Sequence, residues 1–268
     1  MADPFAEFNY DRFKKQILAL TSLDLDVYRQ PQLQRRLQAL LQKHGVSTLS
    51  AYVRLLVDDP QAQRDFKSDI MINTTAFFRD AEQFERLRTT FLPELMQRNG
   101  PQTLRFWSAG CSTGAEAYTL AMLMREDFPQ ATCSILATDI DADVIRLARQ
   151  GVFKTHEIQD VSDALKAKYF EPRGDRYALC ETLKRAVIFR TSNLLQDSFE
   201  AEFDLISCRN VMIYFTQEAQ DLLYQKFHQA LALNGLLFVG SAELIPDPAA
   251  FGFGSAGPFF YRKTAPCG

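Results

Sequence analysis

From about residue 103 onward, short apolar runs alternate with amphipathic stretches of helical length. The runs LRFWSAG, CSILATDI, FDLISCRN and GLLFVGSAE are separated by stretches such as AEAYTLAMLMREDF, ADVIRLARQGV and EAQDLLYQKFHQALAL. Parallel neighbouring strands need a crossover connection, and that connection is usually a helix. The alternation therefore predicts an α/β domain built on a mainly parallel, Rossmann-like sheet.

The first 70 residues follow a different pattern. Leu, Phe and Val recur at spacings of three and four in YDRFKKQILAL, LQRRLQALLQKH and LSAYVRLLVDD, which is typical of amphipathic helices. We divide the 268 residues into an N-terminal helical domain with its linker, residues 1–85, and the α/β domain, residues 86–268. Residues 165–192 interrupt the alternation, and Gly174-Asp175 predicts a β-hairpin within this inserted β-subdomain.

Bulk composition excludes several classes of function. The formal net charge of −3 argues against a protein that binds nucleic acid with its whole surface. Five cysteines and three histidines stand singly, without metal-ligand spacing, so we expect reduced thiols and no metal site. The N-terminus has no apolar signal region, and no apolar run is long enough to span a membrane. We expect a cytoplasmic protein without membrane insertion.

Two features of the α/β domain indicate a nucleoside-containing ligand. The loop GCSTG, residues 110–114, joins the first strand to a helix, and Asp139 ends the next strand. Glycines allow a ligand to approach the backbone, and a carboxylate at that strand end can accept hydrogen bonds from ribose hydroxyls. The alternative is a tight β–α turn in which Asp139 only caps a helix. A nicotinamide cofactor is disfavoured because the GxGxxG pattern is absent.

Four segments identify a resemblance to a known family. The segments IMINTTAFFRD (70–80), FWSAGCSTGAEAYTLAM (106–122), ILATDIDADVIRLARQGVF (135–153) and FDLISCRNVMIYF (203–215) resemble those of the chemotaxis receptor methyltransferases, the CheR family. SNLLQ (192–196) and LFVGSAE (237–243) are similar to the same pattern. The resemblance extends over nearly the whole chain.

The resemblance implies a helical N-domain, a seven-stranded methyltransferase domain and a small antiparallel subdomain inserted in it. It implies S-adenosylmethionine as methyl donor, S-adenosylhomocysteine as product, and glutamates of methyl-accepting chemotaxis receptors as acceptors. Arg79 and Tyr214 would face the reacting centre as catalytic residues. The cofactor contacts that it predicts are Asn73, Thr75, Arg79, Ala109, Gly110, Ala115, Glu116, Asp139, Asn193, Leu194, Arg209 and Asn210.

One position departs from the family. The family usually reads STGEEPYS, and this chain has Ala115 where the first of the two acidic residues stands. Glu116 could replace it only if the helix began at a different residue, because adjacent side chains point about 100° apart on a helix. We expect weaker cofactor binding as a result.

The chemistry of such a reaction requires no general base. A glutamate carboxylate, with an ordinary pKa of about 4.3, is ionised at neutral pH and can attack the sulfonium methyl directly. Catalysis then consists of positioning the reactants and excluding water. The planar fork of Arg79 can orient a carboxylate, and Tyr214 can donate a hydrogen bond. Without the motifs, Arg79 would be read as a solvated charge and Tyr214 as a packing residue.

A basic helix in the N-domain indicates how a receptor docks. No acidic residue occurs from Val27 to Val57, and Arg35, Arg36 and Lys43 share one side of a helix. The pattern fits a contact with an acidic receptor helix, and it fits an ordinary solvated face equally well. A phosphate backbone could use the same charges.

Two rival functions remain at this stage. One is methylation of nucleic acid or a small molecule, which would favour an NPPY-like motif after the fourth strand instead of CRNVMIYF. The other is a cofactor-binding adaptor without catalysis.

Some family members bind a C-terminal receptor peptide through the inserted subdomain. The short loop PRGDR, residues 172–176, leads us to expect methylation that is independent of such a tether.

Overall fold

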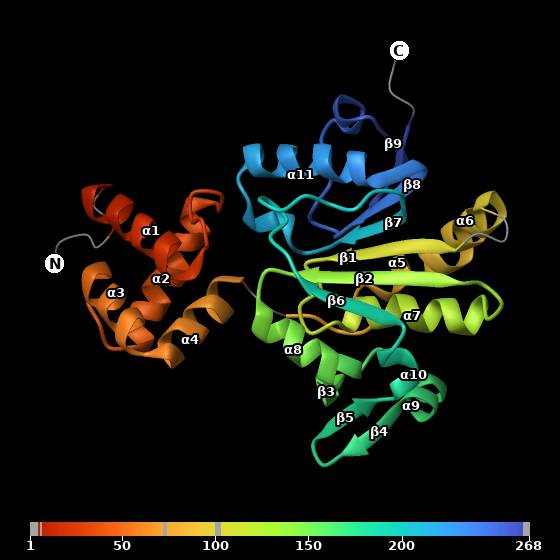
Figure 1. The fold of residues 1–268 in the computed structure, drawn as a ribbon, viewed down its shortest axis with the longest axis horizontal. Coiled ribbons are helices and arrows are strands. Elements are labelled where there is room, and N and C mark those ends of the chain that lie inside the picture. The colour runs from red at the N-terminus through yellow and green to blue at the C-terminus, as the bar shows by residue number, and fades with distance from the viewer. Residues whose placement is uncertain (1–4, 6, 72–73, 100–102, 265–268) are drawn as a thin grey trace. The chain divides into compact units, whose positions relative to one another are not determined.

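A computed structural model describes residues 5, 7–71, 74–99 and 103–264, and the chain divides into two compact units (Figure 1). The helical unit comprises Met1–Asn73 with Tyr214–Gln220, and the α/β unit comprises Thr74–Ile213 with Asp221–Gly268. The division after residue 73 lies before the boundary expected after residue 85. The reason is that Phe84 packs in the α/β unit, with its ring 5.6 Å from that of Phe238.

The helical unit is formed by amphipathic helices whose apolar faces are buried together. Their bounds are α1 (Glu7–Thr21), α2 (Gln30–Lys43), α3 (Leu49–Asp58) and α4 (Pro60–Met71). Phe13, Leu37, Tyr52 and Phe66 are almost fully buried, as the spacing of three and four predicts. Thr48 begins α3, because its hydroxyl accepts a hydrogen bond from the amide of Ala51.

The α/β unit is built on a seven-stranded sheet in the order β6-β2-β1-β7-β8-β10-β9. Neighbouring strands from β6 to β8 are parallel, and β10 is antiparallel to both β8 and β9. Every residue of β7 is buried, as is usual for a strand covered on both faces. This confirms the expected fold. The strands are β1 (Leu104–Ala109), β2 (Cys133–Asp139), β6 (Val187–Thr191), β7 (Phe203–Cys208), β8 (Leu231–Val239), β9 (Phe253–Gly257) and β10 (Phe260–Lys263).

Helices cover this sheet and connect its strands. Helix α7 packs against β1, β2 and β6, and α8 packs against β2 and β6. The helices are α5 (Ala81–Arg86), the π-helical η1 (Leu87–Phe91), α6 (Leu92–Asn99), α7 (Ala115–Asp127), α8 (Ala142–Gln150), η2 (Thr155–Ile158), α9 (Asp163–Tyr169), α10 (Glu181–Lys184), η3 (Met212–Tyr214), α11 (Gln217–Ala230) and η4 (Pro248–Phe251).

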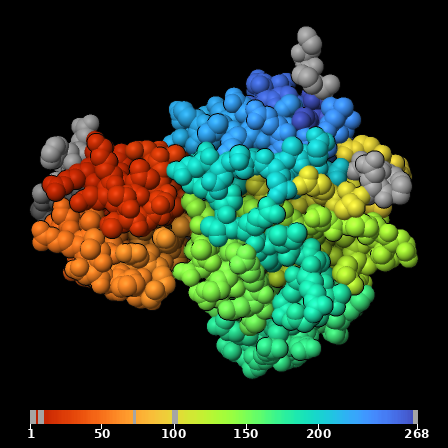
Figure 2. All heavy atoms as spheres, in the orientation of Figure 1, coloured from red at the N-terminus to blue at the C-terminus, as the bar shows by residue number. Residues whose placement is uncertain are grey.

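A second, three-stranded antiparallel sheet has the order β3-β5-β4, with β3 (Val152–Lys154), β4 (Phe170–Arg173) and β5 (Arg176–Leu179). Strands β4 and β5 form a hairpin around Gly174-Asp175, as predicted. The small sheet and its helices lie at the lower end of the α/β unit in Figures 1 and 2.

The extent of this subdomain differs from the expected segment 165–192. The small sheet already begins with β3, and β6, which falls inside that segment, pairs with β2 in the large sheet. Burial of Val187 and Phe189 favours this pairing.

Candidate active site

The predicted cofactor residues of the sheet gather at one edge. Ala109 pairs with Thr138, Asp139 pairs with Thr191, and Cys208 pairs with Val239. Because these strands are parallel, their carboxyl ends lie side by side, which is where open α/β sheets bind ligands. The predicted residues that end these strands or follow them closely are Ala109, Gly110, Ala115, Glu116, Asp139, Asn193, Leu194, Arg209 and Asn210.

The glycine loop is held by the end of β2. The amides of Gly110 and Cys111 donate to the carbonyl oxygen of Thr138, at 2.8 and 2.9 Å. Gly110 has a φ of +78°, and a Cβ at this position would lie 2.4 Å from a methyl carbon of Val211. Glycine is therefore required here by the turn and by packing against Val211.

Asp139 supports the same loop. Its carboxylate accepts hydrogen bonds from the amides of Ser112, at 2.8 Å, and Asp141, at 3.0 Å. The residue is only 8% exposed, and burial raises the pKa of its carboxyl group. Asp139 caps neither flanking helix, because the N-cap residues of α7 and α8 are Gly114 and Asp141. Its contact with a ribose stays a prediction.

Helix α7 begins at Ala115, directly after Gly114. Ala115 is fully buried. The Glu116 carboxylate accepts a hydrogen bond from the Ser108 hydroxyl, at 2.7 Å, and forms an ion pair with Arg209, at 3.4 Å. Glu116 therefore already has two partners within the protein.

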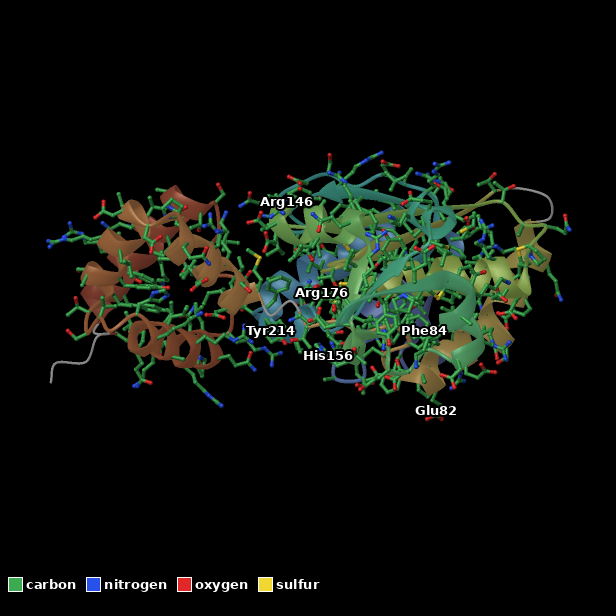
Figure 3. All side chains as sticks on the ribbon, turned by 90° about the horizontal axis from the view of Figure 1, so that it is seen from below. Glu82, Phe84, Arg146, His156, Arg176 and Tyr214 are labelled. Atoms are coloured by element: carbon green, nitrogen blue, oxygen red, sulfur yellow. The ribbon has the colours of Figure 1, made fainter. Side chains whose placement is uncertain are left out.

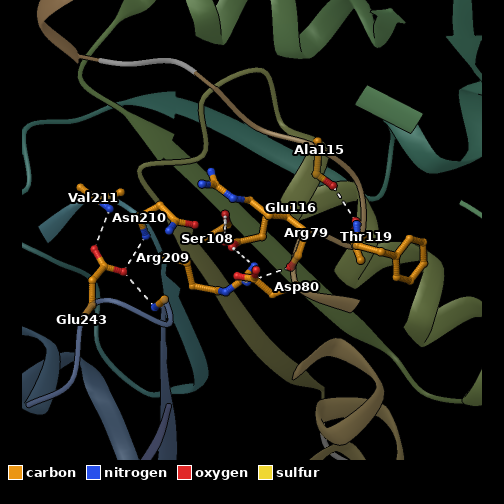
Figure 4. Close-up of polar contacts among 12 residues, drawn as sticks. Arg79, Asp80, Ser108, Ala115, Glu116, Thr119, Arg209, Asn210, Val211 and Glu243 are labelled. Carbon is orange, nitrogen blue, oxygen red and sulfur yellow. Dashed lines mark hydrogen bonds and ion pairs between the residues drawn. The ribbon is translucent and has the colours of Figure 1, made fainter. Parts of the chain in front are cut away.

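Arg209 contacts α7 through Glu116, and it contacts the segment before α5 through Arg79 and Asp80, as Figure 4 shows. One terminal nitrogen of its guanidinium, Nη2, donates to the Asp80 carboxylate at 2.7 Å and to the carbonyl oxygen of Arg79 at 2.8 Å. The rings of Phe84 and Phe238 lie 4.9 and 4.6 Å from the guanidinium carbon. The side chain is 2% exposed, and its Nε has no hydrogen-bond partner in the described part of the chain.

The motif that carries Arg79 has a constrained backbone. Phe77 packs by its ring against Phe153 and Phe170 of the small sheet. Phe78 and Asp80 have positive φ angles of 52° and 61°. Such left-handed residues persist where surrounding contacts enforce them, and they concentrate at functional sites.

Contacts on both sides stabilise this conformation. The Phe78 amide donates to the Thr119 hydroxyl of α7 at 3.2 Å. The Arg79 side chain donates to the carbonyl oxygen of Thr74 at 3.0 Å, and neighbouring Thr75 is half-buried.

The two predicted cofactor residues shortly after β6 have partners within the protein. The Asn193 side-chain oxygen accepts from the amide of Leu195 at 3.0 Å. Leu194 is buried, and its carbonyl oxygen accepts from Lys226 at 2.6 Å.

Tyr214, labelled in Figure 3, belongs to the helical unit. Its carbonyl oxygen accepts from the amide of Arg29 at 2.9 Å, and the Arg36 guanidinium lies 4.6 Å from its ring centre. Arg79, the other predicted catalytic residue, belongs to the α/β unit. Asn73, a predicted cofactor contact, lies outside the described residues.

Comparison with known proteins assigns the chain to a family. Residues 73–256 match the model of the CheR methyltransferase SAM-binding domain, and residues 9–71 match the CheR methyltransferase all-alpha domain. The chain is 35% identical over 261 residues to a chemotaxis protein methyltransferase of Listeria monocytogenes, covering 97% of this chain and 99% of that one.

The chain belongs to the CheR methyltransferase family. A second relative, chemotaxis protein methyltransferase 1 of Pseudomonas aeruginosa, is 32% identical over 252 residues, with 90% of this chain and 91% of that one covered. The resemblance found in the sequence motifs is confirmed, and the protein is a methyltransferase that uses S-adenosylmethionine.

Two buried groups of this CheR site fit that cofactor. The unpartnered Nε of Arg209 is a donor suited to a carboxylate such as that of the methionine moiety. The Asp139 carboxylate can accept from ribose hydroxyls in addition to its two amides, because each of its oxygens has two lone pairs.

The family motifs also contain supporting residues that we did not assign to the site from the sequence. Each of them binds a backbone or side-chain group of a predicted residue: Ser108, Thr119, Asp80 and Glu243. A signal existed for Glu243, which ends the apolar segment LFVGSAE, since a carboxylate at such a place needs partners.

Two cysteines near the CheR site are packing residues. Cys111 and Cys208 are buried, and burial raises the pKa of both thiols well above the ordinary value. Within the described residues, no group of three His, Cys, Asp or Glu side chains has metal-binding geometry. No helix in the described ranges is long and apolar enough to cross a membrane.

A cavity of about 680 Å³ lies between α5, α7 and α9 of the CheR α/β unit. Phe84 lines it from within the unit, and Glu82 points outward in Figure 3. Its lining contains none of the predicted cofactor residues that the structure describes. One of its lining residues, Phe84, also lies against the Arg209 guanidinium.

Proposed function

We propose that the protein transfers the methyl group of S-adenosylmethionine to the γ-carboxylates of glutamates in the cytoplasmic helices of chemotaxis receptors. The observation that carries this proposal is the near full-length similarity to chemotaxis protein methyltransferases. The products are a glutamate methyl ester and S-adenosylhomocysteine, and the ester supports adaptation of the receptor. Since the acceptors are cytoplasmic helices, the enzyme works in the cytoplasm.

The bound cofactor supplies an electrophilic methyl group on a sulfonium centre. In our proposal Asp139 holds the ribose hydroxyls, and Arg209 and Asn210 hold the polar end of the cofactor. The ion pairs of the buried Arg209 with Asp80 and Glu116 support this role, because they fix the guanidinium before any ligand arrives.

Arg79 and Tyr214 are the proposed catalytic residues. Arg79 presents a guanidinium fork that can orient the acceptor carboxylate, and its strained neighbours Phe78 and Asp80 support a positional role. Tyr214 would donate a hydrogen bond through its hydroxyl. No residue needs to remove a proton, because the acceptor is already ionised at neutral pH.

The receptor contact is proposed for the exposed face of α2. Two of the three basic residues predicted for this role have partners within the helical unit. Lys43 forms ion pairs with Asp65 and Asp69, and Arg36 stacks on Tyr214. Arg35 is exposed, so we assign to it the main electrostatic contact with an acidic receptor helix.

A methyl-transfer assay tests the function. The purified protein is incubated with tritiated S-adenosylmethionine and membranes that contain chemotaxis receptors. We expect label in the receptor band that alkali releases as methanol, because an ester is base-labile and a methylated amine or base is not. Alkali-stable label, label in nucleic acid or a small molecule, or cofactor binding without transfer would contradict the proposal.

A further inference from the structure

The carboxylate of Glu243 lies beneath the loop that carries Arg209 and Asn210 (Figure 4). Its Oε2 accepts hydrogen bonds from the amides of Asn210, at 2.5 Å, and Gly240, at 2.8 Å. Its Oε1 accepts from the amides of Val211, at 2.8 Å, and Ile213, at 3.2 Å. Four backbone donors from two loops therefore converge on one carboxylate.

This carboxylate has no counter-ion among the residues that the structure describes, and Glu243 is only 4% exposed. Burial raises the pKa of the group, while the four amides act in the opposite direction. A buried carboxylate of this kind is stable only while its amide donors remain in place. The arrangement therefore restricts the loop to one conformation.

The backbone conformation of the loop after β7 is unusual. Asn210 has a φ of +60°, in the left-handed region. Gly240 is required for the approach, because a Cβ there would lie 2.5 Å from Oε2 of Glu243 and 3.0 Å from the Asn210 nitrogen. Gly240 and Glu243 therefore act together: both follow the end of β8, and the Glu243 carboxylate binds the loop after β7.

We propose that Glu243 is a positioning residue for the cofactor site, acting through the backbone of residues 210–213 on the placement of Arg209 and Asn210. This inference rests on the proposed cofactor contacts of Arg209 and Asn210. Its binding test needs no receptor.

The test compares Glu243→Gln with Asp204→Asn. Asp204 is the control because it is also buried and lies at the opposite end of β7; unlike Glu243, it accepts one amide, that of Arg105 at 2.9 Å, and pairs with Arg98 at 2.9 Å. The readouts are calorimetric affinity for S-adenosylhomocysteine, amide hydrogen exchange of the peptide covering residues 209–213, and the melting temperature.

We expect both variants to melt at lower temperature, because each replaces one acceptor oxygen by an NH2 group that faces buried or half-buried donors. Only Glu243→Gln should weaken S-adenosylhomocysteine binding, by about tenfold or more, and speed exchange in residues 209–213. Wild-type affinity in Glu243→Gln, or an equal loss in Asp204→Asn, would overturn the proposal.

If Glu243→Gln does not fold, Gly240→Ala serves in its place, since the added methyl displaces the carboxylate and leaves its charge intact. Gly240→Ala with unchanged affinity would likewise overturn the proposal. A wild-type protein that binds S-adenosylhomocysteine but does not label receptors would contradict the proposed function and leave this binding test valid.

Discussion

The guanidinium of Arg209 donates a hydrogen bond to the carbonyl oxygen of Arg79, with 2.8 Å between nitrogen and oxygen. The residues are far apart in the chain, and each stands in one of the family's most specific motifs. Arg209 also pairs with the Asp80 carboxylate, so it holds the Arg79 carbonyl and the side chain of the next residue together. The two motifs thus form one structural unit, in which one arginine orients the segment that presents the other.

Replacing Asp139 by Ala should weaken S-adenosylmethionine binding by about 1.5–3 kcal/mol, because hydrogen bonds from the ribose to a charged acceptor are lost. The variant should also be less stable, since the Ser112 and Asp141 amides lose their acceptor. Calorimetry measures the affinity, with Asp204→Asn as a reference for a variant that is destabilised elsewhere. An affinity equal to that of wild type would remove Asp139 from the cofactor site.

Arg79→Lys should reduce turnover by roughly 10- to 100-fold, because lysine keeps the charge and loses the planar fork that aligns a carboxylate. The melting temperature should change little, since the Arg79 side chain makes only a single hydrogen bond, to Thr74, in the described structure. Initial rates of receptor methylation measure the effect. Arg146→Lys, the same exchange at an exposed residue of α8, is the control and should retain full activity. Normal methylation by Arg79→Lys would show that Arg79 is a surface charge.

Charge reversal at Arg35 tests the receptor contact. Arg35→Glu should raise the KM for receptor and leave cofactor affinity unchanged. The difference from wild type should shrink at high salt, because screening weakens exposed charge interactions. Arg64→Glu, on α4, is the matched reversal. If both variants have the same KM for receptor, the basic side of α2 is an ordinary solvated face.

The buried thiols near the site should resist alkylation. Cys111 and Cys208 are buried with raised pKa values, so they should remain unmodified by iodoacetamide at pH 7.5 in the folded protein. Both should react after denaturation. Peptide mapping by mass spectrometry reports each site separately. Rapid labelling of either residue in the native state would contradict the packing role.

The structure of the small sheet supports the prediction that methylation does not depend on a receptor tether. Both edge strands of this sheet are short: β3 has three residues and β4 has four. Strand β4 includes Pro172, which has no amide to donate to an added strand. The turn between β4 and β5 consists of Gly174-Asp175 alone. We therefore expect no calorimetric signal when a receptor C-terminal pentapeptide is titrated to millimolar concentration. Binding at micromolar concentration would refute this expectation.

Several parts of the molecule could be predicted from local sequence. The spacing of apolar residues predicted the helical domain and the α/β domain, and Gly174-Asp175 predicted the hairpin. The glycine loop and Asp139 were recognised because strand ends are marked by short-range patterns. In each case the determining interactions lie within a few residues or repeat with the period of the element.

Other features depend on pairing between distant segments, which local patterns do not encode. Strand β6 belongs to the large sheet because its backbone pairs with that of β2, which is distant in sequence. Residues 214–220 join the helical unit through hydrogen bonds to Val27 and Arg29. Lys43, part of a basic run in the sequence, is neutralised by acidic residues of α4. Glu243 became a candidate positioning residue only when the fold brought four backbone amides to its carboxylate, since a buried charge takes its role from the partners that the tertiary structure supplies.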